Sequence, residues 1–479
     1  MGDLVLHNEV RLGANPHEVF SMFGRGDPTS GWLFGAEASS LAPGSLVRLV
    51  VPLGGLAGVD GTARVLSFTP SKRIELVHES PWSGKVDCRF DPTVGGGTRV
   101  RLRVTIDEQE IGRLGAELGL IGVSPNDANA VPLGLLISLS GAAGILGRST
   151  VNCAELAVEE VNLDGGVLGR PVQLVVADDA TDPAVGRVAM QRLIDVPNVS
   201  AVIGMHSSAT AAVTCKMAIA AGLPYLYTAT SEITSEHPLL ARFGETPLDQ
   251  LHRALPRLAE GSGASRWFFA GNEYSWPRSI ASTARTIVER MGGTVAGEGF
   301  VKVGARQFEP LLEQIHRSGA DHVISSFVGE DHVRFEREFV AYGLRDRTVT
   351  FAPLMDDAVV EHLGDLADGI WNVLGYFQSL DTPENRAFLS RYRQRFGECS
   401  APVSAAAEGV YEAVHRWARA CRSGRGIDAT AVLRGLQRTG VQGPRLSSPT
   451  GEAARLLLGR ASPSGVQVMD ELPARAASM

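Results

Sequence analysis

The chain has 479 residues, a formal net charge of -8 and a sequence pI of about 5.8. Its length predicts two or more domains, and its acidic balance argues against a nucleic-acid partner, which needs a concentrated basic face. The 5 cysteines are too scattered for a disulfide framework or a zinc site. We therefore expect neither a metal nor a cofactor.

The start of the chain bears on its location. Residues 1–20 lack the basic region and apolar run of a secretory signal. The longest apolar stretches are too short and too rich in glycine and serine to span a membrane. We therefore expect a cytoplasmic protein without membrane insertion, whereas a different start site encoding an export signal would place it outside the cytoplasm.

Residues 1–120 have the pattern of a mostly β domain. Alternating runs separated by glycine and proline predict strands, and the glycines at 95–97 predict a hairpin turn. Asn15 and Pro16 predict the N-cap and first residue of a short helix. With "NPHEVF" at 15–20, this order resembles the START-like polyketide cyclase/aromatase superfamily. That resemblance implies a helix-grip fold, with residues 108–122 as the candidate for its closing helix.

A linker at 121–131, rich in turn formers, separates this domain from a region of alternating strand and helix patterns, 132–479. Such alternation predicts parallel sheets covered by helices on both faces. Two successive series predict an α/β region of two doubly wound lobes. The first lobe is expected at 132–252, with a return of the chain near 380–440, and the second at 253–379.

The ends of the predicted strands carry hydroxyls, aromatic rings and carboxylates, next to glycines. Ligands of such sheets bind beyond the carboxyl ends of the strands, and this set of groups suits a small polar ligand. The chain has no GxxxxGK[ST] motif and no GxGxxG that opens a helix, which argues against nucleotide binding.

The stretch "GMHSSAT" at 204–210 joins a predicted strand to a predicted helix. It lacks the GxSxG elbow of a serine nucleophile, so we expect no catalytic residue and no enzyme. Ser207 or Ser208 could cap the helix, or Ser208 could hold a ligand oxygen beside the helix N–H groups. We favour the ligand-binding interpretation.

Residues 131–445 resemble the type I periplasmic-binding-protein fold of the branched-chain amino acid (Leu/Ile/Val) receptor family. The motifs that carry this resemblance are "GLLISLSG", "VIGMHSSAT", "YLYTATSEIT" and "GADHVISSFVG". Within that family, "GNEYSWPRS" at 271–279 resembles the amide-sensing regulator of aliphatic amidase operons and the receptors for urea and short-chain amides. The resemblance implies a two-lobed protein that closes on a small polar ligand.

The resemblance also implies a set of ligand-binding residues. His206 stands where the amide subgroup has a tyrosine, and "DDATDP" at 178–183, which could suggest a metal site, is a structural segment in the family. The residues carried over by motif are Ser208, Tyr227, Thr228, Thr230, Tyr274 and Trp276, with Met355, Asp356 and Asp357 in the place of a group that binds the ligand's ammonium.

Three roles follow from these features. The chain could be an intracellular sensor of an amide, urea or amino acid that acts on a regulatory protein partner. It could instead be the solute-binding component of an ABC importer, with a permease as partner. The third alternative is a START-like enzyme or carrier that the receptor lobes regulate. The resemblance also implies that two copies of the chain could pair as a homodimer.

Overall fold

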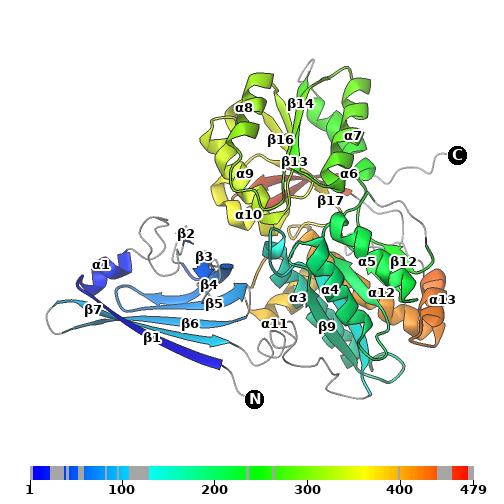
Figure 1. The fold of residues 1–479 in the computed structure, drawn as a ribbon, viewed down its shortest axis with the longest axis horizontal. Helices are drawn as coiled ribbons and strands as arrows, with labels where there is room; N and C mark the ends of the chain where they lie inside the picture. Colours follow the sequence, from blue (N-terminus) through cyan, green and yellow to red (C-terminus); the bar gives the residue numbers. More distant parts are fainter. Residues whose placement is uncertain are drawn as a thin grey trace. The chain divides into compact units, whose positions relative to one another are not determined.

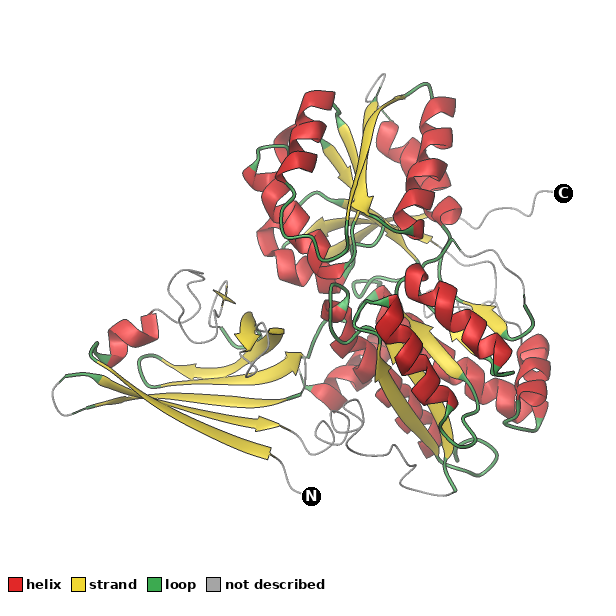
Figure 2. Cartoon of the chain, viewed as in Figure 1, coloured by secondary structure: helices red, strands yellow, loops and turns green. Residues whose placement is uncertain are grey.

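The computed structural model describes residues 4–21, 37–38, 42–51, 59–80, 83–93, 96–106, 129–232, 237–260, 265–397, 400–439 and 456–472. The chain divides into two compact units, one formed mainly by the residues up to Val123 and one mainly by those from Ser124 onward. Figure 1 traces the chain through both units, and Figure 2 shows their helices and strands. No helix within the described ranges is long and apolar enough to cross a membrane.

The first unit is a seven-stranded antiparallel sheet in the order β1-β7-β6-β5-β4-β3-β2. As the sequence predicts, β6 and β7 form a hairpin in which Pro92 lies opposite Thr98. Its elements are β1 (Leu4–Leu12), α1 (Pro16–Ser21), β2 (Glu37–Ala38), β3 (Leu46–Val51), β4 (Val59–Thr69), β5 (Arg73–Ser80), β6 (Gly84–Pro92) and β7 (Thr98–Ile106).

One face of this sheet forms a core because apolar residues alternate along its strands. Val86, Cys88 and Phe90 on β6 pack with the apolar residues of neighbouring strands and with Phe20 of α1. Asn15 caps α1, since its Oδ1 accepts the N–H group of Glu18 at 3.0 Å. The helix predicted at 108–122 lies outside the described residues, so the helix-grip fold stays a prediction.

The second unit contains two α/β lobes, as predicted. Lobe one has a parallel five-stranded sheet in the order β12-β11-β10-β8-β9, covered by helices on both faces. Its elements are β8 (Val131–Ile137), η2 (Gly144–Leu146), α3 (Gly147–Leu163), β9 (Val172–Asp178), α4 (Pro183–Ile194), β10 (Val202–Met205), α5 (Ser208–Ala220), β11 (Tyr225–Tyr227), β12 (Leu240–Arg242), α11 (Pro383–Phe396), α12 (Ala405–Gly424) and α13 (Ala429–Thr439).

Lobe two has a seven-stranded sheet in the order β14-β13-β15-β16-β17-β18-β19, of which the first five strands are parallel. Among its described residues, one apolar cluster centres on α7 and another on α9. Its elements are α6 (Pro247–Ala259), β13 (Arg266–Asn272), α7 (Ser275–Arg290), β14 (Thr294–Val301), α8 (Glu309–Ser318), β15 (His322–Ser326), α9 (Gly329–Ala341), η3 (Arg345–Arg347), β16 (Val349–Phe351), α10 (Asp357–Leu363), η4 (Gly364–Ala367), β17 (Trp371–Leu374), β18 (Leu456–Ser462) and β19 (Gly465–Leu472).

The structure differs from the predicted lobe boundaries at two points. Helix α6 already packs in lobe two, where Leu251 and Leu255 join the cluster around Trp267, so that lobe begins near 247 and not at 253. The hairpin of β18 and β19 also belongs to lobe two, because β18 pairs antiparallel with β17.

The chain therefore passes between the lobes three times: before α6, between β17 and α11, and between α13 and β18. The first two crossings run side by side, since the N–H group of Gly375 donates to Oε1 of Glu245 over 2.7 Å. Gly375 follows β17 and Glu245 precedes α6. This buried contact ties the two crossings together.

Candidate functional site

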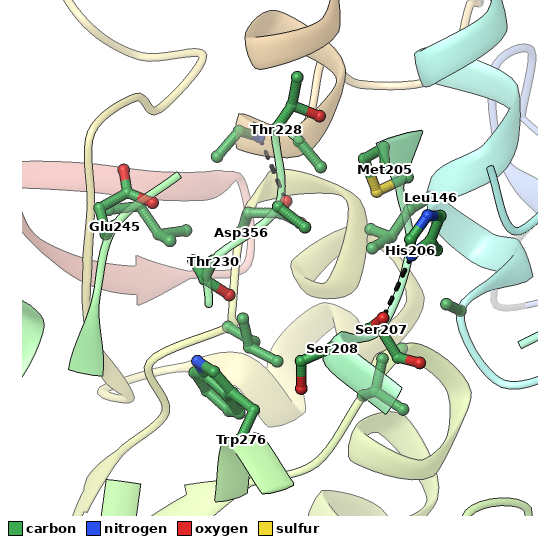
Figure 3. A pocket seen from close by; sticks show the side chains of 18 of the residues that line it. Leu146, Met205, His206, Ser207, Ser208, Thr228, Thr230, Glu245, Trp276 and Asp356 are labelled. Carbon is green, nitrogen blue, oxygen red and sulfur yellow. Dashed lines mark hydrogen bonds between the residues drawn. The ribbon is translucent and has the colours of Figure 1, made fainter. Parts of the chain in front are cut away.

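A pocket lies between the two lobes, at the carboxyl ends of their parallel strands. Figure 3 shows its side chains around one space, with Leu146, Met205 and His206 together on one side and Glu245 on the other. The space amounts to about 760 Å³, part of it open to solvent. It is lined by Ala143, Leu146, Met205, His206, Ser207, Ser208, Thr228, Ala229, Thr230, Glu245, Tyr274, Trp276, Val328, Gly329, Leu354, Asp356, Val359, Leu374, Ala405 and Ala406.

Several helices begin at this pocket, among them α5 and α12 of lobe one and α7 and α9 of lobe two. The first N–H groups of a helix lack partners within the helix and give its start a partial positive charge. Neither lysine nor arginine is among the lining residues that the structure describes. The pocket can therefore attract an oxygen-bearing group through main-chain dipoles instead of a cationic side chain.

Ser207, and not Ser208, is the cap of α5. The Ser207 Oγ accepts the N–H group of Thr210 at 3.2 Å. The Ser208 hydroxyl instead lies 3.2 Å from the Oγ of Ser275, which begins α7 in the other lobe. Ser208 therefore stands where the two lobes and the pocket meet.

His206 lines the pocket as a neutral side chain. Its Nδ1 lies 3.1 Å from the carbonyl oxygen of Ser207, which can only accept, so Nδ1 carries the proton. Its Nε2 then accepts the hydroxyl of Tyr225 at 2.6 Å. Burial lowers the pKa of His206, against an opposing effect of Asp179. With both nitrogens bonded within the protein, His206 offers the ligand its carbon edge.

Trp276 carries a donor without an acceptor. Its side chain is 1% exposed, and Nε1 has no hydrogen-bond partner within the described part of the chain. Figure 3 shows the ring at the edge of the pocket, near Ser208 and Thr230. A buried N–H group without a partner costs free energy, so a ligand oxygen placed here would remove that cost.

Asp356 links the pocket to both lobes. One carboxylate oxygen accepts the N–H groups of Ala358 and Val359 in α10, and the other accepts that of Ala405 at the start of α12. Burial, with the neighbouring Asp357, raises the pKa of Asp356 to about 7. Asp357 does not line the pocket and instead accepts the N–H groups of Gln378 and Val466.

Like Asp357, two further predicted site residues lie outside the pocket lining. Tyr227 belongs to the core of lobe one, and its hydroxyl donates to the carbonyl oxygen of His206 at 2.7 Å. Met355 is fully buried outside the pocket. The structure brings the others together at the pocket: His206, Ser208, Thr228, Thr230, Tyr274, Trp276 and Asp356.

The sequence interpretation missed several lining residues. Glu245 lies in a crossing between the lobes, where no motif marks it, although Thr246 and Asp249 show that a helix begins just afterwards. Val328 and Gly329 follow β15, so the strand-end rule indicated their segment, but neither has a reactive or charged side chain. Ala405 has only a methyl side chain, so its residue type does not indicate a ligand-binding role.

The segment 178–183 is structural, as the resemblance implied. Asp178 Oδ1 accepts the N–H groups of Leu139 and Ala180, both at 2.8 Å. Asp179 accepts the hydroxyl of Ser138 at 2.5 Å. Asp182 caps α4. Each carboxylate is thus used in holding the loop after β8 or the next helix.

Comparisons with known proteins agree with this architecture. The model of a family described as "Periplasmic binding protein" matches residues 130–456. The "Leu/Ile/Val-binding protein homolog 7" of Brucella melitensis is 25% identical over 342 residues, covering 67% of this chain and 84% of that protein. It is named as a binding protein and not as an enzyme.

Solved structures show the same fold. The branched-chain amino acid transporter substrate-binding protein LivJ from Streptococcus pneumoniae, in complex with isoleucine, superposes with a TM-score of 0.63 at 18% identity, covering 71% of this chain and 98% of that one. A solute-binding protein of an ABC transporter from R. palustris, in complex with benzoate, gives 0.62 at 20% identity, covering 71% and 96%. The chain belongs to the periplasmic binding protein family.

Proposed function

We propose that the second unit captures a small molecule with an oxygen-bearing end and an apolar body, and that its lobes close around this ligand. The unpaired indole N–H group of Trp276 carries the proposal, because a buried donor needs an acceptor. Ser208 and the start of α5 supply further donors on the facing lobe. Binding energy from both lobes favours the closed form over the open form.

The rest of the pocket narrows the ligand class. Leu146, Val359 and Leu374 provide apolar walls, which suit an aliphatic or aromatic body. Glu245 and Asp356 are carboxyl groups that can accept the N–H groups of an ammonium or an amide. Amino acids and short amides carry an oxygen for the donors at Trp276 and α5, and N–H groups for these two carboxyl groups. Aromatic acids carry an oxygen for the donors and an apolar body for the walls.

The proposed role is that of a solute-binding protein that delivers its ligand to an ABC permease. One observation favours a second candidate, a sensor inside the cell that acts on a regulatory protein. The family model begins at residue 130, so the seven-stranded first unit lies outside it. An extra unit of this kind could transmit lobe closure to a partner, or act as a START-like enzyme or carrier under control of the lobes.

A thermal-shift screen of the full chain tests the proposal. The panel contains acetamide, urea, leucine, isoleucine, benzoate and 4-hydroxybenzoate. A ligand at about 100 times its Kd should add roughly 2.7 kcal/mol to the stability of the lobes. We expect one chemical class to raise the melting temperature.

Matched variants connect the shift to the site. Trp276→Phe keeps an aromatic ring but removes the indole N–H group, so it should weaken binding by about tenfold, the cost of one good hydrogen bond. Ser208→Ala should also weaken it, while Ser282→Ala, at an exposed serine of α7, should not. A panel without any shift, or a ligand that binds Trp276→Phe normally, would overturn the proposal.

A further inference from the structure

The backbones of the two lobes meet beside the pocket. The N–H group of Glu330, in the first turn of α9, donates to the carbonyl oxygen of Ala142 over 2.7 Å. Ala142 lies after β8 in lobe one, whereas α9 belongs to lobe two. Gly329 precedes Glu330 and lines the pocket. This contact joins the two lobes directly in the arrangement that the structure shows.

Glycine is required at position 329 by geometry. Its φ of +48° lies in the left-handed region, which glycine adopts at little cost. A Cβ built on Gly329 would lie only 2.1 Å from the carbonyl oxygen of Ala142. Since both atoms sit on main chain, the overlap cannot be relieved by turning a side chain. Any other residue here would push the two lobes apart.

The lobe-one side of the contact is held in place before closure. Asp178 fixes the backbone of Leu139, and the Thr181 hydroxyl accepts the N–H group of Ala143 at 3.0 Å while donating to the carbonyl of Ser140. These bonds lie entirely within lobe one. The carbonyl of Ala142 is therefore presented by a loop that closure does not need to rebuild.

The lobe-two side is equally fixed. Asn272, the last residue of β13, is fully buried. Its Oδ1 accepts the N–H group of Val328 at 2.9 Å, and its Nδ2 donates to Asp331 at 2.8 Å. The turn that carries Gly329 is thereby anchored on both sides to the sheet of lobe two.

We propose that Gly329, Glu330 and Ala142 form a backbone latch, meaning the N–H···O=C bond and the glycine contact that allows it, which sets the equilibrium between open and closed lobes. The inference rests on the proposed function, because it assumes that closure completes the site. The latch contains no side-chain donor or acceptor. It therefore stabilises closure by the same amount whatever ligand lies in the pocket.

Cross-linking measures closure without a ligand. The hydroxyls of Ser208 and Ser275 lie 3.2 Å apart across the lobes, so Ser208→Cys with Ser275→Cys places two sulfurs within reach of a disulfide. The full chain is treated with a mild oxidant, and the rate at which this disulfide forms is followed by peptide mass spectrometry. The rate reports how often the lobes close.

The matched comparison uses the two ends of α9. Gly329→Ala should slow disulfide formation by about tenfold or more, because overpacking at a rigid contact disfavours closure. Gly343→Ala is the control: Gly343 follows α9, also has a positive φ, of +73°, and has nothing within 4 Å of its added Cβ. Gly343→Ala should carry a similar free-energy cost for placing alanine at a positive φ, but it should leave the cross-linking rate unchanged. Gly329→Asn, which tolerates the left-handed region but retains a Cβ, should behave like Gly329→Ala.

Two outcomes would overturn the latch. One is equal cross-linking rates for Gly329→Ala and Gly343→Ala variants with similar melting temperatures. The other is a parent cysteine pair that never cross-links, since the closed arrangement itself would then be absent. If Gly329→Ala slows cross-linking but no compound of the thermal-shift panel raises the melting temperature, the proposed ligand class is rejected and the latch is retained.

Discussion

Asp356 shows how one buried carboxylate serves both the pocket and the fold. It is 3% exposed, yet three N–H groups donate to it, two from lobe two and that of Ala405 from lobe one. Burial raises its pKa to about 7, and burial also raises the pKa of Asp357 to about 6. Both values lie above the ordinary value of 3.8, so the folded chain binds these protons more tightly than the unfolded chain.

A pH dependence of stability follows. The stabilisation from these two protons is fully present below about pH 4 and is lost as the pH rises through 6 to 7. We expect Asp356→Asn to flatten the dependence of the unfolding free energy between pH 5 and pH 8 by on the order of 2 kcal/mol. Urea unfolding followed by tryptophan fluorescence measures this slope. Asp346→Asn, at an exposed aspartate, should leave it unchanged, and identical slopes for both variants would contradict the prediction.

Single residues also show where sequence reasoning about the site succeeded and failed. The family resemblance assigned Ser208, Thr228 and Thr230 to the ligand site, and the structure places them at the pocket, where they follow buried parallel strands. Tyr227 and Met355 each directly precede a pocket residue. Tyr227 ends β11, and adjacent side chains of a strand point in opposite directions. Met355 instead follows a turn in which its N–H group donates to the carbonyl oxygen of Ala352. A motif match reveals neither which side chain of a strand end nor which side chain of a turn faces the ligand.

At the scale of elements, the loop after β8 depends on a carboxylate from the neighbouring strand. Asp178 ends β9 and accepts backbone N–H groups of that loop. It also accepts the hydroxyl of Ser140 at 2.6 Å. The loop carries Ala143 and Leu146 into the pocket, so one aspartate positions part of the binding wall.

Removing this carboxylate should loosen the loop. We expect Asp178→Ala to cost about 2 kcal/mol of stability, since charged hydrogen bonds are lost, and to speed amide hydrogen exchange at residues 139–146. Asp182→Ala removes only the cap of α4 and should cost about 1 kcal/mol without affecting that loop. Hydrogen-exchange mass spectrometry distinguishes the two. Unchanged exchange of the loop in Asp178→Ala would show that other contacts hold it.

The elements that the sequence predicted best are those with regular periodicity. The alternation of strand and helix patterns predicted the parallel strands of both sheets, and "NPHEVF" predicted α1 with its cap. The hairpin of β18 and β19 was missed, although it completes the sheet of lobe two. Its position in that sheet depends on a pairing with β17, more than 80 residues earlier, and local periodicity carries no information about such a distant partner.

At the scale of the whole molecule, the two units have separate cores. The cluster around Phe90 contains only residues of the first unit, and those around Trp267, Tyr225 and Phe335 contain only residues of the second. Because none of these four clusters of described residues is shared, cooperative unfolding need not couple the two units.

Calorimetry of the full chain should therefore show two transitions. A ligand of the lobes should raise the temperature of only one, since it stabilises only the unit that binds it. Phe90→Ala in the first unit should lower the temperature of the other transition, because it should reduce the unfolding free energy of that unit by about 3–5 kcal/mol. If the chain instead showed a single transition, and both the ligand and Phe90→Ala shifted it, the two units would not unfold independently.

The three crossings between the lobes have a consequence for proteolysis. The first two of them lie at 243–246 and 375–382. A protease that cuts one of them leaves two unbroken connections, and neither resulting fragment corresponds to a single lobe. A cut at 375–382 leaves α11, α12 and α13 of lobe one on the same fragment as the β18–β19 hairpin of lobe two. That fragment packs in both lobes, so the nicked protein separates only when parts of both lobes unfold.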